Sequence, residues 1–327
     1  MSINKLKIFF LGSGTLAVPV LKTLAASSIL TFAGGATGIS KPGKRGKKLI
    51  PTPVNQAADF TGVTLEEVGN VNTPEFVEKL KEIDPDMILV VSFGQILKRD
   101  ILSLPRYGCV NIHPSVLPRY RGASPVVQAI LNQDKYTEVC YMQMERGLDS
   151  GAVYRRIPCP LDGTEYCDAL EKHLSEIAAD NLEETLTGIA DGKYQPIPQS
   201  GEITLCGKTG KNDGIINWYD DVQNIYAKIR AFHPWPGGCA WEISGNEPCR
   251  LTISKVLPRP DLSAAPGVMV TGTPKNQLCI GCGSGGALEL LEVIPQGGKA
   301  MTGASFRNGR RGANLVFSPS GAPDGSE

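Results

Sequence analysis

The sequence predicts an α/β protein in which a doubly wound parallel-sheet domain is followed by a small β-barrel of the OB-like kind. In the first half of the chain, short apolar runs such as 7–11 and 87–91 alternate with amphipathic segments of helical length. Strands separated by such helices imply a parallel sheet, which binds ligands beyond the carboxyl ends of its strands. After residue 236 the pattern changes to short strand-like runs separated by glycine and proline, which is typical of a small closed barrel.

The first elements follow from apolar periodicity and turn residues. Residues 7–11 are predicted to form a strand, followed by a glycine turn and an amphipathic helix over 17–26. A second strand is expected at 29–33, and the glycine-rich stretch 34–40 is expected to break regular structure. A helix over 73–83 then leads to the buried strand at 87–91.

The glycine turn Gly12–Ala17 formally fits the dinucleotide-binding fingerprint. That cofactor requires an acidic residue about twenty positions further on, whereas the next acidic residue is Asp59. A tight turn between strand and helix is therefore the favoured interpretation.

Composition also places the domain boundaries. Residues 1–192 are predicted to form the first domain, Rossmann-like in character, and 193–204 a proline-containing linker. The barrel is expected over 205–317 and a disordered tail, rich in Ser, Gly and Pro, over 318–327. The barrel domain opens with a helix, and its strands are expected at 239–243, 250–256, 267–270, 277–280 and 288–294.

With 327 residues, of which 41% are hydrophobic, the chain is long enough for about two domains. Its nine cysteines are an odd number in a chain too large to need disulfides, which fits a reducing compartment. The first apolar run is too short for a signal peptide, and no stretch approaches the roughly 18 residues of a membrane span. We expect a cytoplasmic protein that acts as a monomer away from membranes.

Charge is unevenly distributed, because residues 1–58 hold eight Lys or Arg and no Asp or Glu although the formal net charge is zero. Five of these cations fall within eight residues: Lys41, Lys44, Arg45, Lys47 and Lys48. Such a basic run is either a solvated charge cluster or a nucleic-acid clamp, and composition alone leaves both open.

A polar pair is expected on the strand Cys109–His113. Because side chains alternate along a strand, Asn111 and His113 point to the same face. Pro114 and Pro118 fix backbone angles and remove donors, so the strand must give way to a rigid loop. An amide donor and a titratable imidazole therefore lie side by side at a strand end.

A helix start and a turn supply two further features. Ser124 reads as an N-cap with Pro125 at the first helical position, and unpaired amides at a helix start suit a developing oxyanion. Asp149 lies in the turn 145–151 between glycines. A turn carboxylate is usually a local cap, so Asp149 alone does not indicate catalysis.

Asn111, His113 and Asp149 together can help an outside nucleophile attack a carbonyl. The amide and an imidazolium stabilise the oxyanion, while the carboxylate orients the imidazole or relays a proton from an amine. The sequence has no Gly-x-Ser-x-Gly elbow and only three histidines, so covalent catalysis and a multi-histidine metal site are not favoured. Cys279 and Cys282 lack a second cysteine pair of zinc spacing, and we expect no metal.

The motifs around these residues resemble those of the folate-dependent formyltransferases. Residues 111–122 read Asn-x-His-x-Ser-x-Leu-Pro-x-x-Arg-Gly, and residues 147–151 read Gly-Leu-Asp-Ser-Gly. The methionyl-tRNA branch of that family is indicated more specifically by Arg45–Pro53, Arg230–Pro236 and Gly298–Met301. The resemblance covers residues 7 to about 311.

This resemblance implies transfer of the formyl group of 10-formyltetrahydrofolate to the α-amino group of methionyl initiator tRNA, for translation initiation. It implies that Asn111, His113 and Asp149 are catalytic in the first domain. It further implies that the folate is contacted by Ser115, Val116, Leu117 and Pro118. The basic run would enter the acceptor arm of the tRNA, and the barrel would support the tRNA.

Two alternatives remain. A formyltransferase acting on a small amine, either an amino-sugar nucleotide or glycinamide ribonucleotide, would use the same polar residues, and Pro114 also resembles the glycinamide ribonucleotide enzyme. That enzyme is usually a single domain, however, and the five cations offer an amino sugar no evident benefit. A catalytically inactive RNA-binding relative is disfavoured because all three polar residues are present.

Overall fold

The computed structural model describes residues 5–43, 48–245, 247–310 and 314–321. The chain divides into two compact units. The first takes in the chain up to Pro125, Tyr136–Pro160 and Ala169–Gly207. The second takes in Val126–Lys135, Leu161–Asp168 and the chain from Lys208 onwards. Among the described residues, no helix has both the length and the apolar character needed to cross a membrane.

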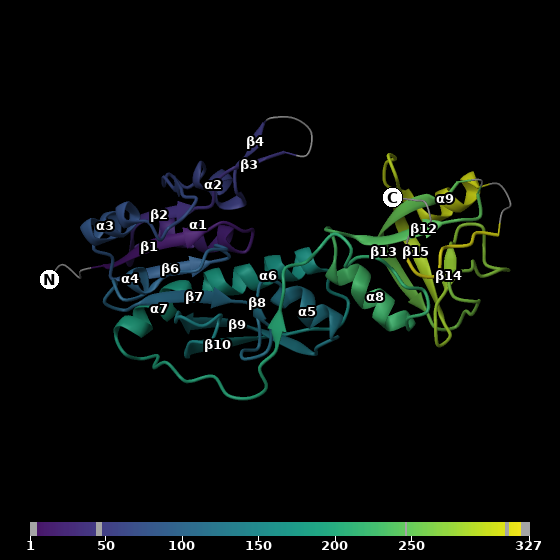
Figure 1. The fold of residues 1–327 in the computed structure, drawn as a ribbon. Coiled ribbons are helices and arrows are strands. Elements are labelled where there is room, and N and C mark those ends of the chain that lie inside the picture. Colours follow the sequence, from purple (N-terminus) through teal and green to yellow (C-terminus); the bar gives the residue numbers. More distant parts are fainter. Residues whose placement is uncertain (1–4, 44–47, 246, 311–313, 322–327) are drawn as a thin grey trace. The chain divides into compact units, whose positions relative to one another are not determined.

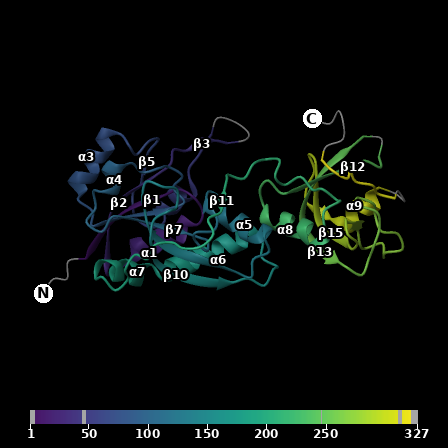
Figure 2. The same cartoon turned by 60° about the horizontal axis from the view of Figure 1, so that its bottom comes forward.

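A seven-stranded sheet in the order β10-β9-β7-β6-β1-β2-β5 forms the centre of the first unit. Figure 1 shows the strands from β10 to β2 side by side, and Figure 2 labels β5. The five strands from β7 to β5 are parallel, which confirms the predicted α/β class. β9 pairs antiparallel with β7, and β10 pairs antiparallel with β9. The bounds are β1 Leu6–Gly12, β2 Leu30–Thr37, β5 Glu66–Glu67, β6 Met87–Val91, β7 Cys109–His113, β9 Tyr136–Gln143 and β10 Val153–Pro160.

The reversal of direction at β9 follows from the connection that precedes it. This connection contains the short strand β8 (Arg121–Gly122) and the helix α5 (Pro125–Leu131). β7 and β9 pair antiparallel, with His113 opposite Cys140. The first residues of β9 therefore lie beside the carboxyl end of β7. The connection therefore starts and finishes at the same end of the strands and does not cross to their other end.

The second strand is longer than the sequence predicts. β2 spans Leu30–Thr37, so the expectation that residues 34–40 lack regular structure is wrong for the first four of them. Gly34 has a φ of +148°, and a Cβ on Gly35 would stand 2.7 Å from Cδ2 of Leu65. These glycines allow a register shift against β1 and a close approach of neighbouring groups. They prolong the strand instead of ending it.

Helices cover the sheet of the first unit. On one face, Phe9, Ile88 and Val90 share a buried cluster with Phe76 and Ile101 of α3 and α4. Because side chains alternate, the neighbouring buried residues of β1 and β6 face the other side. There α1 packs against α2 and α7. The helix bounds are α1 Ala17–Ala26, α2 Pro53–Ala58, α3 Pro74–Ile83, α4 Arg99–Leu102, α6 Cys167–Asp180 and α7 Leu182–Ala190.

The second unit contains a curled antiparallel sheet in the order β12-β13-β15-β14, with β16 paired to β15. Helix α8 (Val222–Ala231) lies against β13, as Figures 1 and 2 show, and α9 (Gly303–Gly309) packs on β15. Trp218, Leu251 and Phe317 are fully buried between these elements. The strands are β12 Gly238–Glu242, β13 Cys249–Arg259, β14 Cys279–Gly281, β15 Ala287–Pro295 and β16 Met301–Thr302.

Single bridges join the two edges of this curled sheet. They are Met269–Ile280 beside β14, Val268–Val316, and Phe317–Glu242 in β12. The edge strands β14 and β12 are thus linked through two short extended segments, at residues 268–269 and 316–317. This closure of the curled sheet confirms the predicted OB-like barrel. The strand expected at 267–270 is present only as these bridges. Beyond residue 317, the carbonyl of Pro319 accepts a hydrogen bond of 2.8 Å from the Trp218 N–H.

Candidate active site

β7 carries Asn111 and His113 side by side. The strand predicted over 109–113 has these bounds in the structure. Both side chains point to one face of the sheet because the residues are two apart. They are buried, with exposed fractions of 9% and 4%. Within the described part of the chain the Asn111 side chain has no hydrogen-bond partner, so its amide can donate to a substrate.

The loop after β7 presents a carbonyl to His113. Tyr120 has a φ of +62°, and its carbonyl oxygen lies 3.0 Å from Nε2 of His113. A carbonyl oxygen only accepts, so this contact places a proton on Nε2. The Tyr120 N–H in turn donates to Oγ1 of Thr204 at 2.8 Å, and Sγ of Cys206 donates to the Tyr120 carbonyl at 3.3 Å.

Asp149 reaches His113 from the turn between β9 and β10. Its Oδ2 atom lies 3.7 Å from Nδ1 of His113 and accepts a 2.8 Å hydrogen bond from the Gly122 N–H. Its backbone is left-handed, with a φ of +45°. The carboxylate therefore bonds across the chain to the loop after β7 and stands beside the imidazole.

Burial lowers the pKa of His113, although the nearby Asp149 carboxylate and the Tyr120 carbonyl both act to raise it. The ring is therefore neutral near pH 7, with its proton on the Nε2 side. Nδ1 then carries a lone pair that faces Asp149. The imidazole and the carboxylate can together accept one proton, and the resulting imidazolium would be paired on both nitrogens.

The segment 115–118 is packed tightly at the start of the same loop. Oγ of Ser115 donates to the carbonyl of Arg119 at 2.8 Å, and the Ser115 carbonyl accepts from Sγ of Cys140 at 3.1 Å. Ser115, Leu117 and Pro118 are buried, whereas Val116 is half-buried. The hydroxyl of Ser115 thus shapes the loop, and Val116 is the member with the most accessible side chain.

Comparison with known proteins identifies the family. Residues 6–186 match the family described as Formyl transferase, and residues 208–311 match its C-terminal domain. The methionyl-tRNA formyltransferase of Methylococcus capsulatus is 36% identical over 305 residues, which cover 93% of this chain and 96% of that protein. The methionyl-tRNA formyltransferase of Thermodesulfovibrio yellowstonii is 34% identical over 306 residues, again with 93% and 96% covered. The chain belongs to the methionyl-tRNA formyltransferase family.

Solved structures share the fold of this family member. A variant of HypX from Aquifex aeolicus matches with a TM-score of 0.63 at 16% identity, over 95% of this chain and 48% of that chain. An N-formyltransferase from Helicobacter canadensis matches with a TM-score of 0.62 at 15% identity, over 87% and 98%. The methionyl-tRNA formyltransferase from Clostridium thermocellum gives 0.52 at 19% identity, over 77% and 93%. At these identities the likeness establishes the fold.

The sequence analysis did not identify the residues that hold His113 and Asp149 in place. Tyr120, Gly122 and Thr204 act through backbone or short side-chain contacts, and Gln199 bonds to the carbonyls of Asp149 and Gly151. Gly122 has a φ of +124°, and a Cβ there would stand 2.1 Å from the Cys206 carbonyl oxygen. No local pattern marks these contacts, because their partners are distant in the chain.

The basic run is only partly described. Lys41 lies in β3 (Lys41–Pro42), which pairs with β4 (Leu49–Ile50) as a small two-stranded ribbon. Lys41 and Lys48 are exposed. Lys44, Arg45 and Lys47 lie outside the described residues.

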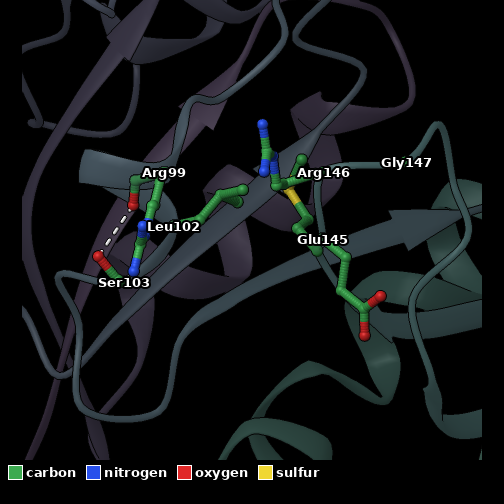
Figure 3. Close-up of a pocket in the computed structure, with 7 residues that line it drawn as sticks. Arg99, Leu102, Ser103, Glu145, Arg146 and Gly147 are labelled. Atoms are coloured by element: carbon green, nitrogen blue, oxygen red, sulfur yellow. Dashed lines mark hydrogen bonds between the residues drawn. The ribbon is translucent and has the colours of Figure 1, made fainter.

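A cavity of about 400 Å³ borders the turn that leads to Asp149 (Figure 3). In Figure 3 the hydroxyl of Ser103 donates to the carbonyl of Arg99 at the end of α4. Neither Asn111 nor His113 lines the cavity. Its lining residues are Arg99, Leu102, Ser103, Met144, Glu145, Arg146 and Gly147.

Cys279 and Cys282, the cysteine pair of the barrel, are both buried. Burial raises the pKa of Cys279 to about 11 and that of Cys282 to about 12. Across the residues that the structure describes, no group of three or more metal-binding side chains comes together.

Proposed function

We propose that this protein transfers the formyl group of 10-formyltetrahydrofolate to the α-amino group of methionyl initiator tRNA, for translation initiation. The observation that carries the proposal is the approach of His113 to Asp149 beside an unpartnered Asn111 amide among the described residues. It occurs in a chain that is a third identical to methionyl-tRNA formyltransferases over nearly their whole length.

The proposed chemistry assigns Asn111, His113 and Asp149 as catalytic residues. A free α-amino group has a pKa of about 7.7 to 8.0, and an ester lowers it, so enough of the amine is neutral near pH 7 to act as the nucleophile. The amine nitrogen attacks the formyl carbon, and the Asn111 amide donates to the resulting oxyanion. The proton released by nitrogen passes to the His113–Asp149 pair. Collapse breaks the bond from carbon to the folate nitrogen, which takes up a proton.

The proposed folate contacts lie in Ser115, Val116, Leu117 and Pro118, with no metal taking part. The folate assignment is supported by the family match and by HypX from Aquifex aeolicus, which shares the fold and was solved in complex with tetrahydrofolic acid. Because the Ser115 hydroxyl is engaged within the loop, this segment would contact folate through Val116 and through loop shape.

The proposed tRNA contacts are Lys41, Lys44, Arg45, Lys47 and Lys48, together with the barrel over 205–317. We also propose residues 1–192 as the catalytic domain, with the protein acting as a cytoplasmic monomer. Support for tRNA comes from the family, since its members are named for that substrate. Clustered cations with glycines between them suit a phosphate backbone.

Formyl transfer to charged initiator methionyl-tRNA tests this function. Elongator methionyl-tRNA, glycinamide ribonucleotide and an amino-sugar nucleotide serve as parallel acceptors. We expect transfer to the initiator tRNA alone. Transfer only to a small amine would overturn the substrate while keeping the chemistry, and transfer to no acceptor would favour an inactive RNA-binding relative.

A further inference from the structure

Residues 197–206, which we call the strap, run along both loops of the candidate active site. At one end Ile197 pairs with Val153, with hydrogen bonds of 2.8 and 3.0 Å. At the other end β11 (Leu205–Cys206) pairs in parallel with β8. These backbone contacts anchor the strap independently of its side chains. The strap includes most of the segment that the sequence predicts to be a linker.

Gln199 lies between these anchors and joins the two loops. Its Nε2 donates to the carbonyl oxygens of Asp149 and Gly151, both at 2.8 Å. Its Oε1 accepts from Nε and Nη2 of Arg121 at 3.1 and 2.7 Å. The residue after Arg121 is Gly122, whose N–H donates to the Asp149 carboxylate. The amide of Gln199 therefore ties the loop after β7 to the turn that presents Asp149.

We propose that Gln199 is a positioning residue that holds Asp149 against His113. This inference rests on the proposed role of Asp149 in formyl transfer. The residues 145–148 that precede Asp149 are exposed, so packing does little to fix the turn. Asp149 itself keeps a left-handed backbone, a conformation that persists when surrounding contacts determine it. Donation by Gln199 to the Asp149 carbonyl supplies such a contact.

The strap also supports the other side of the His113–Asp149 pair. Thr204 accepts from the Tyr120 N–H, and Cys206 donates to the same Tyr120 carbonyl that faces Nε2 of His113. Removal of the Gln199 side chain leaves these contacts in place. Loss of the Gln199 side chain should therefore make the turn that carries Asp149 more mobile while His113 keeps its orientation. The effect is thus specific to Asp149 within the His113–Asp149 pair.

The first test compares Gln199→Leu with Gln195→Leu. Gln195 is an exposed glutamine just before the strap, and its Nε2 donates to the Gly192 carbonyl at 2.8 Å, away from both loops of the site. We expect Gln199→Leu to lower kcat for formyl transfer by about ten- to a hundredfold, since a misplacement of about 1 Å can cost a hundredfold. KM for initiator tRNA and the urea midpoint should stay close to those of Gln195→Leu. Equal kcat values for the two variants would overturn the proposal.

A second test asks whether Gln199 acts through Asp149. Asp149→Asn should lower kcat, and addition of Gln199→Leu to that variant should cause no further loss, because the group being positioned is already gone. Multiplying losses would show that Gln199 acts elsewhere. If Asp149→Asn alone retains full turnover, the proposed function of Asp149 fails, which is a separate result.

Gln199→Glu distinguishes the donor function of the Gln199 side-chain amide from its acceptor function. The carboxylate can still accept from Arg121 but cannot donate to the Asp149 carbonyl. We therefore expect a loss of kcat close to that of Gln199→Leu, with a similar urea midpoint. Full turnover in Gln199→Glu would show that donation to the turn is dispensable and would overturn the assignment.

Discussion

Nδ1 of His113 lies 3.7 Å from Oδ2 of Asp149, while Nε2 of the same ring is held by the Tyr120 carbonyl. One nitrogen is thus anchored and the other is left to share a proton with a carboxylate. A buried imidazole in this arrangement stays neutral until a proton is released beside it. That property matches a reaction in which an attacking amine must lose a proton.

Removal of the imidazole should abolish most of the turnover without weakening substrate binding. For His113→Ala we expect kcat to fall by about a hundredfold or more, the scale of one acid–base group. The affinity for initiator tRNA, measured by filter binding, should not change. His173→Ala is the matched control, because His173 is exposed on α6. A parallel loss of tRNA affinity would mean that His113 is structural.

The free energy of unfolding should decrease below about pH 6.5 because of His113. Burial holds its pKa below the ordinary value of 6.5, so the folded protein binds this proton less tightly than the unfolded chain. The corresponding stability is complete above about pH 6.5 and is lost as the pH falls below that value towards the folded pKa. Between about pH 7 and pH 5, wild-type protein should lose more free energy of unfolding than His113→Gln, as measured by urea titration. Parallel pH curves would contradict this.

Neutralising the basic run should weaken tRNA binding and flatten its salt dependence. Replacement of Lys41, Lys44, Arg45, Lys47 and Lys48 by Gln should remove about four ion pairs with phosphates and so reduce the log–log slope by roughly three. Lys79→Gln with Lys81→Gln on α3 provides a control, since both lysines are exposed and paired with glutamates. An unchanged slope would identify the run as a solvated charge cluster.

Gly122→Ala should destabilise the protein and reduce turnover together. The new Cβ would come within 2.1 Å of the Cys206 carbonyl, so β8 and β11 could not pair as they do. We expect a loss of about 2–3 kcal/mol in the free energy of unfolding. Gly108→Ala is the control, because Gly108 also has a positive φ, of +70°, but a Cβ there would meet nothing within 4 Å. If both variants lose the same stability, backbone strain alone explains the effect.

Local patterns were sufficient for elements whose bounds depend on nearby residues. The helix predicted over 17–26 and the strands predicted at 87–91 and 109–113 have those bounds in the structure. Prolines, glycines and apolar periodicity act within a few residues, so the sequence expresses them directly. The alternation of a strand likewise placed Asn111 and His113 on one face.

Contacts between distant segments had to come from the tertiary structure. The glycines at 34 and 35 predict an end to regular structure when only their neighbours in the sequence are considered. In the structure, β1 and β5 pair with that stretch and make it a strand. The segment 193–204 reads locally as a linker, yet Gln199 and Thr204 in it bond to the loops of the site. Pairing free energy from a distant strand overrides local preference, and no pattern within one segment records it.

The sequence by itself determined the two-part α/β and barrel organisation, the family, and the identity of the three polar residues. Only the tertiary structure decided that Asp149 bonds to Gly122 and approaches His113, because its turn follows an antiparallel strand whose direction depends on a returning connection. Chemical identity is a property of single residues. Their distances depend on every intervening strand and loop.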